Sequence, residues 1–186
     1  MLFTIPEGKH TAKPFRFGIW FRKKTFTWKV WFDTSCTYDL NGVDQADTNK
    51  LCGVGYFSKL RIIPKKYFNK INFFAFEPMH WTDSARFGWR YDAQKNQIEL
   101  MAYCYVNGNR VIKSICFCDT SEEYRISLTV SGGVYVFKCL DSSVDYIYGM
   151  SIVNARNFKN LKYRLGVYFG GNQTAPHTMC INLSAL

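Results

Sequence analysis

The chain has few acidic residues, few histidines and no long apolar run. It carries 14 Asp and Glu against 24 Lys and Arg, which leaves a formal net charge of +10. This imbalance favours an acidic partner, such as nucleic acid, an anionic polysaccharide or an acidic protein surface, and charge alone does not choose among them. No segment has the apolar length that a membrane-spanning helix needs, so we expect no membrane partner.

The first residues also lack the features of an export signal. The stretch from Met1 to Phe15 has neither a basic start nor an apolar centre. We therefore expect the protein to stay in the cytoplasm of the cell that makes it. The sequence contains no glycine-rich phosphate loop and no nucleophile elbow, and we expect neither a cofactor nor a metal.

Cysteine is plentiful by comparison. The one close pair, Cys116 and Cys118, is a C-x-C without a matching Cys or His pair, which argues against a zinc site. Most cysteines lie in apolar, strand-like context, where a thiol behaves as a small hydrophobic group. We predict reduced thiols in the core and a reducing compartment. The seven are Cys36, Cys52, Cys104, Cys116, Cys118, Cys139 and Cys180.

Aromatic residues make up 18% of the chain, which fits a protein rich in β-sheet. Alternating apolar runs separated by turn residues predict an antiparallel meander, and Asn107-Gly108 is a strong hairpin signal. We predict one all-β domain over residues 1–186, a two-sheet antiparallel jelly-roll sandwich of about ten strands. The predicted strands include Ala85–Tyr91, Gln97–Val106, Arg110–Cys118, Tyr124–Val130 and Val134–Leu140.

Two other segments are harder to interpret. Phe15–Arg22 and Thr25–Phe32 resemble the two arms of an aromatic hairpin. A short helix is predicted near Tyr67–Phe74. A basic and aromatic cluster from Lys59 to Lys70 suits phosphate contact with base stacking, but it lacks a known nucleic-acid motif, so a solvated or protein-binding surface is the commoner reading and nucleic acid is not the expected partner.

The C-terminal run from Lys162 to Leu183 alternates as a strand and then turns. Its pattern places Tyr163, Leu165 and other apolar residues on one face, with Arg164 and Tyr168 together on the other. Pairing should stop at Pro176 and resume at Thr178, which would leave His177 at the rim of the sheet.

Three motifs resemble those of alginate-lyase-type polysaccharide lyases of the concanavalin-like superfamily. They are Arg86-Phe87-Gly88-Trp89-Arg90, Gln97-Ile98-Glu99 and Lys162-Tyr163-Arg164-Leu165-Gly166-Val167-Tyr168. The resemblance implies β-elimination of an anionic uronate polysaccharide in a groove. Its catalytic residues would be Arg86, Arg90, Gln97, Arg164 and Tyr168. However, the family's glutamate is Gly88 here and its histidine is Glu99, so a non-catalytic protein is the favoured expectation.

If the same strand faces bind a glycan without cleaving it, the residues involved would be Arg86, Arg90, Tyr103, Arg164, Tyr168 and His177. Each also has a structural reading: arginines on a solvated strand face, tyrosines in cross-strand pairs and a histidine in a loop. A glycan-binding module therefore stays an alternative, as does the lyase.

The chain also resembles small jelly-roll proteins of Bacteroidetes bacteria and of their crAss-like tailed phages. The resemblance lies in the aromatic N-terminal segment, SARFGWRY, AYCYVNG and YFGGNQTAPH. It implies a structural protein of the virion, such as a head fibre or capsid decoration, with itself or other virion proteins as partners. The missing export signal and the many cysteines favour this expectation over a secreted lectin or lyase.

Overall fold

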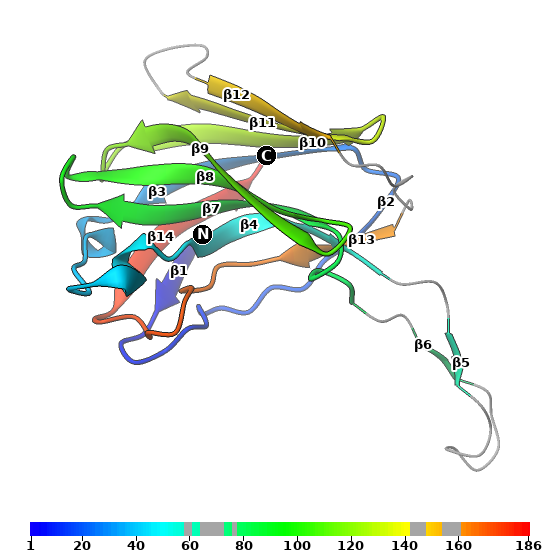
Figure 1. Cartoon of the computed structure of the whole chain (residues 1–186), viewed down its shortest axis with the longest axis horizontal. Coiled ribbons are helices and arrows are strands. Elements are labelled where there is room, and N and C mark those ends of the chain that lie inside the picture. Colours follow the sequence, from blue (N-terminus) through cyan, green and yellow to red (C-terminus); the bar gives the residue numbers. More distant parts are fainter. Residues whose placement is uncertain (58–60, 64–72, 76–77, 142–147, 154–160) are drawn as a thin grey trace.

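Two six-stranded antiparallel sheets, packed face to face, form the body of the molecule in the computed structural model (Figure 1). The structure describes residues 1–57, 61–63, 73–75, 78–141, 148–153 and 161–186. We name the sheets after central strands. In order across it, the β3 sheet contains β1 (Leu2–Ile5), β14 (Met179–Ala185), β3 (Thr25–Phe32), β10 (Glu123–Ser131), β11 (Val134–Asp141) and β12 (Tyr148–Val153).

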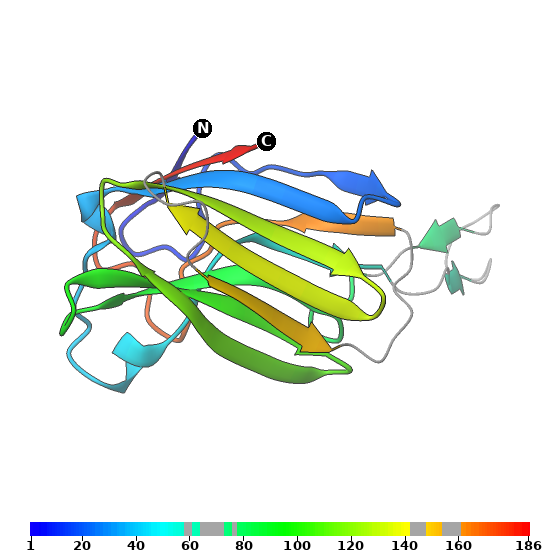
Figure 2. The same cartoon turned by 90° about the horizontal axis from the view of Figure 1, so that it is seen from above.

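The β7 sheet forms the second layer, which is seen from above in Figure 2. A separate pair joins β5 (Arg61–Ile63) to β6 (Phe73–Ala75). Among the described residues, no helix is long and apolar enough to cross a membrane. In order across it, the β7 sheet contains β2 (Ile19–Phe21), β13 (Leu161–Leu165), β4 (Asn49–Tyr56), β7 (Ser84–Asp92), β8 (Gln97–Val106) and β9 (Asn109–Cys118).

The core lies between the two sheets and is built from alternate strand residues. Ile126 and Leu128 of β10 are fully buried. Arg125, which lies between the buried Tyr124 and Ile126, is exposed. Opposite them, Phe87 of β7 meets Phe137 of β11 with 5.0 Å between ring centres. The period-two pattern of each strand thus fixes which side chains enter the core.

Several sequence predictions are confirmed by this architecture. The fold is all-β with two antiparallel sheets, and Asn107 and Gly108 both have positive φ in the turn between β8 and β9. The predicted cysteine environment is also confirmed: six cysteines are buried, Cys180 is half-buried, and all seven carry thiols without a disulfide.

The aromatic hairpin predicted at Phe15–Arg22 and Thr25–Phe32 is wrong. Strand β2 pairs with β13 in one sheet, while β3 pairs with β10 and β14 in the other. The chain changes layers between them because Trp20 packs inward against Phe26, with ring centres 4.9 Å apart. The two strands therefore face each other across the core instead of sharing a ladder.

Two further predictions fall mainly outside the described residues. They are the short helix near Tyr67–Phe74 and the basic cluster from Lys59 to Lys70. Where the structure describes this region, Phe73 and Phe74 belong to strand β6, so the predicted helix does not reach them. The described strands number 14, more than the ten expected.

Candidate functional site

A pocket of about 370 Å³ opens on the outer face of the β7 sheet, the face turned away from the core. Its floor comes from strands β4, β7 and β8, and its walls come from the N-terminal segment, the loop before β7 and the chain after β13. The pocket joins positive charge to aromatic rings. Its lining residues are Thr11, Ala12, Phe15, Lys50, His80, Trp81, Arg86, Tyr103, Gly166, Val167 and Tyr168.

Arg86 reaches this face because its neighbours in β7 point into the core. Ala85 and Phe87 are fully buried between the sheets, so Arg86 must point outward. The neighbouring strand makes room with Gly53. A Cβ placed there would lie 2.3 Å from the Ala85 carbonyl oxygen and 2.4 Å from the Arg86 Cα. The absence of a side chain at Gly53 lets β4 and β7 approach closely beneath the arginine.

The Arg86 guanidinium is almost completely removed from solvent. Only 8% of the residue is exposed, and its Nε has no hydrogen-bond partner among the described residues. Burial lowers the pKa of Arg86, but an arginine stays protonated at neutral pH. The charge of Arg86 also has no carboxylate partner among the described residues, and an anionic ligand in the pocket would neutralise it.

Lys50 supplies a second positive charge in the pocket. A bulge in β4 between Lys50 and Cys52 breaks the regular register with β7. Burial lowers the pKa of Lys50 to about 8, and the positive charge of Arg86 acts in the same direction. The Lys50 Nζ lies 5.2 Å from the centre of the Tyr103 ring. At neutral pH the pocket therefore holds two neighbouring cations.

Tyr168 forms an aromatic wall beside Lys50. Their backbones pair, with N–O distances of 2.8 Å and 2.9 Å, and the Lys50 Nζ lies 5.8 Å from the tyrosine ring centre. His10 stacks on the Tyr168 ring at 5.2 Å, and its Nδ1 lies 2.9 Å from the Phe169 carbonyl oxygen. The N-terminal segment thus fixes the orientation of the tyrosine.

The other wall is built around His80. Its Nδ1 shares a hydrogen bond of 3.0 Å with the hydroxyl of Tyr163. Burial, followed by the charge of Arg86, lowers the pKa of His80, and burial raises the pKa of Tyr163 to about 12. Both side chains are therefore uncharged near neutral pH. The exposed Trp81 stands beside His80, with ring centres 4.6 Å apart.

Of the residues predicted from the sequence, the structure brings Arg86, Tyr103 and Tyr168 into the pocket. Arg90 lies further along β7, where its Nε donates to Glu99 at 2.6 Å and its Nη1 donates to the Ala46 carbonyl oxygen. These contacts satisfy Arg90 within the protein.

The other predicted residues make separate contacts. The Gln97 side chain donates to Asp119 at 2.9 Å, and the ring of His177 is 2.8 Å from the Ser35 carbonyl oxygen. Both bonds hold loops together. Arg90, Gln97 and His177 are not among the residues that line the pocket.

Arg164 does not share a face with Tyr168, contrary to the strand pattern. It stands opposite the core residue Val54 in the β13–β4 pair, and its guanidinium lies 6.0 Å from the ring centre of Phe3. Strand β13 ends at Leu165, so the alternation is lost before Tyr168 pairs with Lys50. A shift of one residue moves a side chain to the other face of a sheet.

Sequence reasoning missed Lys50, His80 and Trp81. Lys50 follows a polar loop and gives no periodic signal, and His80 has no partner nearby in the sequence except Trp81. Lys50 of β4 and Tyr168 are far apart in the sequence, because strands of both sheets lie between them along the chain. Only folding brings the two residues together. No local pattern could have revealed this pair.

An exposed apolar row, formed by alternate residues of the segment from Phe15 to Phe21, leads from the pocket wall into the edge strand β2. Ile19 pairs with Tyr163 and so lies on the same outer face, while Trp20 points inward. Phe15 is 84% exposed and also lines the pocket. A group of exposed apolar side chains is a candidate binding surface. The row consists of Phe15, Phe17, Ile19 and Phe21.

A second hollow, of about 410 Å³, lies on the outer face of the β3 sheet near Lys29 and Glu123. There the two charges already form an ion pair of 2.6 Å. This hollow offers no unsatisfied buried cation, so the Arg86–Lys50 pocket is the stronger candidate.

Comparison with known proteins is informative about the fold. No family model matches the sequence, and no curated protein matches it. Among solved structures, an alginate lyase from Klebsiella pneumoniae is 8% identical with a TM-score of 0.55, covering 87% of this chain and 59% of the lyase. The chain thus spans under two thirds of that enzyme.

Two other structures are similar. The family 7 alginate lyase A1-II′ in complex with product is 12% identical with a TM-score of 0.53, over 100% of this chain and 80% of that one. A functionally unknown protein from Saccharomyces cerevisiae is 10% identical with a TM-score of 0.51, over 92% and 74%. The fold is therefore a jelly-roll sandwich of the concanavalin-like type. At these identities the resemblance to alginate-lyase-type proteins is one of fold alone.

Proposed function

We propose that this protein binds an acidic polysaccharide, with a uronate carboxylate held between Arg86 and Lys50. The observation that carries the proposal is the buried Arg86, which lines the pocket and forms no ion pair among the described residues, while a second cation lies nearby. A carboxylate accepts hydrogen bonds from both a guanidinium and an ammonium group, and it would offset the cost of their burial.

The walls of the pocket suit a sugar ring. Tyr168, Trp81 and Phe15 present aromatic faces around the two cations, and flat rings pack well against the apolar faces of pyranoses. The volume of about 370 Å³ fits a small ligand unit. Two solved structures of the same fold are named alginate lyases, which agrees with an acidic polysaccharide as the ligand class.

The exposed row from Phe15 to Phe21 extends the binding surface beyond one sugar unit. Phe15 lines the pocket, and Ile19 of β2 lies on the same outer face of the sheet. A polymer whose first unit occupies the pocket would place its following units over this row. We therefore expect oligomers to bind more tightly than the monosaccharide.

The test is calorimetric titration with oligouronates, using neutral cello-oligosaccharides of equal length as the comparison. We expect binding of the acidic oligomers only. Arg86→Met should lose at least tenfold in affinity, because it removes the charge and keeps much of the side-chain volume. Arg125→Met is the matched control, since Arg125 is exposed on the other sheet. Equal loss in both variants would mean nonspecific charge attraction and would contradict the pocket.

A lyase is the second candidate, and the position of Lys50 favours it. With a pKa of about 8, a fraction of Lys50 is neutral near physiological pH and able to accept a proton. In β-elimination, Arg86 would neutralise the uronate carboxylate, Lys50 would take the proton on the adjacent carbon, and Tyr168 would donate a proton to the leaving glycosidic oxygen. The products would be an unsaturated uronate and a new sugar end.

Absorbance from new unsaturated ends tests the lyase directly, with alginate, glucuronan and heparin as substrates. Loss of signal in Tyr168→Phe with binding retained would support catalysis. No signal with any of the three substrates, in a protein that binds oligouronates, would leave a glycan-binding module.

The virion role, the cytoplasmic location and self-association stay predictions from the sequence. Neither the described structure nor the comparisons give support for the phage assignment. Mass spectrometry of purified virions that lacked this chain would contradict it.

A further inference from the structure

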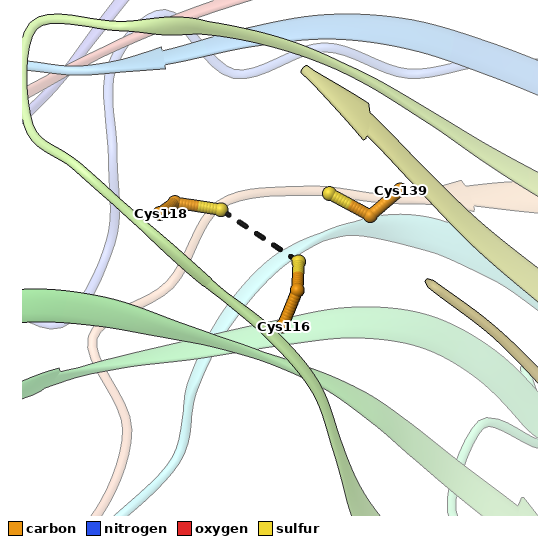
Figure 3. A group of neighbouring side chains, drawn as sticks. All are labelled: Cys116, Cys118 and Cys139. Atoms are coloured by element: carbon orange, nitrogen blue, oxygen red, sulfur yellow. Dashed lines mark hydrogen bonds between the residues drawn. The ribbon is translucent and has the colours of Figure 1, made fainter. Parts of the chain in front are cut away.

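Three of the seven cysteines gather at one point in the core (Figure 3). Cys116 and Cys118 come from β9, and Cys139 comes from β11 of the opposite sheet. All three side chains are buried, and their sulfur atoms lie within 4.8 Å of one another. The Sγ atoms of Cys116 and Cys118 are 3.8 Å apart. The cluster therefore bridges the two layers of the sandwich.

The path of β9 explains why these thiols meet. The strand is the edge of the β7 sheet and crosses obliquely toward the other layer before the chain enters β10 (Figure 2). A register shift between Leu100 and Met101 of β8 falls opposite Cys116 in β9. Only the C-x-C pair is visible in the sequence, and the third sulfur comes from β11, two strands further along the chain.

One of the three sulfur separations matches that of thiolates sharing one metal ion, and the other separations are no longer than 4.8 Å. With metal–sulfur bonds of about 2.3 Å, two thiolates on one ion lie roughly 3.8 to 4.0 Å apart in tetrahedral or trigonal geometry. The Cys116–Cys118 distance already has this value. The third sulfur needs a movement of about 1 Å or less to complete the triangle, which a rotation about χ1 supplies.

We propose that Cys116, Cys118 and Cys139 form a three-coordinate site for a soft monovalent ion, Cu⁺. The donor set is all sulfur, since no His, Asp or Glu among the described residues joins the cluster. Thiolates favour soft ions such as Cu⁺, whereas Zn²⁺ in structural sites requires a fourth ligand. Each thiol that binds the ion releases its proton to solvent.

The alternative is a set of core thiols that only pack and hydrogen-bond. In that arrangement the Cys116 and Cys118 thiols lie at hydrogen-bonding distance from each other, 3.8 Å between their sulfur atoms. Cys104 offers a comparison, because it is equally buried but stands outside the cluster. A packing role predicts that Cys104 and Cys139 respond alike to copper, whereas a metal site predicts that they differ.

The test titrates Cu⁺ into the reduced protein under anaerobic conditions, in competition with a chromogenic Cu⁺ chelator. The half-buried Cys180 is replaced by Ala throughout to remove the most accessible thiol. We expect one equivalent of Cu⁺, a thiolate-to-copper absorption band, and sulfur neighbours only in X-ray absorption spectra. Cys139→Ser should lose at least 100-fold in affinity, while Cys104→Ser should bind as the parent does.

Thermal unfolding of each variant without metal separates misfolding from loss of a ligand. If Cys139→Ser is unfolded, Cys118→Ser and Cys116→Ser take its place, with the sulfur count from X-ray absorption as a second readout. Absence of Cu⁺ binding by the folded parent would overturn the site, as would equal affinity in the Cys139 and Cys104 variants. Binding of Zn²⁺ in preference to Cu⁺ would also overturn it.

Discussion

The guanidinium carbon of Arg86 lies 5.3 Å from the centre of the Tyr103 ring, directly across the β7–β8 pair. This contact holds the arginine along the sheet surface and leaves its Nε without a hydrogen-bond partner among the described residues. The outward pair Arg90–Glu99, which lies beyond Gly88 and Met101, differs. Arg90 and Glu99 satisfy each other at 2.6 Å. Among the described residues, Arg90 thus has a carboxylate partner and Arg86 has none.

Arg86→Met should bind acidic oligosaccharides poorly and yet unfold no more easily than the wild type. Methionine keeps the packing of the aliphatic stem and removes a buried donor that has no partner, which costs about 1 to 3 kcal/mol when unsatisfied. We expect the free energy of unfolding in urea to stay constant or rise by about 1 kcal/mol. A large fall in stability would show that Arg86 serves the fold.

Affinity for acidic oligosaccharides should fall as the pH rises through about 8, where Lys50 loses its charge. The Lys50→Arg variant should hold its affinity to higher pH, because a guanidinium stays protonated. Calorimetric titrations of both proteins from pH 6.5 to 9.5 measure this difference. Identical pH profiles would remove Lys50 from the binding site.

Lys50 should also make the free energy of unfolding depend on pH. Its pKa is lowered from 10.5 to about 8 in the folded state, so between these values the unfolded chain binds more protons than the folded one. Its contribution to stability therefore rises with pH over that window and is smallest below pH 8. The Lys50→Met variant should lack this rise when urea unfolding is compared with the wild type from pH 7 to 10.

Gly53→Ala should disrupt the site through the backbone. The new Cβ would meet the Ala85 carbonyl oxygen and the Arg86 Cα well inside contact distance, so β4 and β7 must separate. We expect a loss of about 3 kcal/mol in the free energy of unfolding together with weaker ligand binding. Gly166→Ala is the control for stability alone, because nothing lies within 4 Å of its Cβ position but the residue lines the pocket. Similar losses of stability in both variants would contradict the close approach of the strands.

Two ion pairs offer a comparison of buried and exposed charge. Glu99→Gln removes the charge of a carboxylate whose side chain is 8% exposed, whereas Glu123 in the Lys29 pair is 49% exposed. We expect Glu99→Gln to cost about 2 kcal/mol, the worth of a hydrogen bond to a charged group. Glu123→Gln should cost about 0.5 kcal/mol. Thermal and urea unfolding of the two variants check the order, and a reversed order would contradict it.

The strands with clear alternation were predictable, and so were the residues that they carry to each face. In β7, Phe87 and Trp89 point inward while Arg86 points outward, as the pattern indicated. The same logic failed for Arg164, because β13 ends before Tyr168 and the period is interrupted. It also failed for the partner of Phe15–Arg22, since two adjacent strands in sequence entered different sheets.

The sequence by itself determined the all-β class, the hairpin at Asn107-Gly108 and the outward placement of Arg86, because these depend on local φ preferences and period-two burial. Only the tertiary structure decided that Lys50 joins Arg86 and Tyr168 in one pocket and that Cys139 joins Cys116. Such meetings depend on the order of strands in a sheet and on the packing of one sheet against the other. No short stretch of the sequence specifies the strand order or the packing of the sheets.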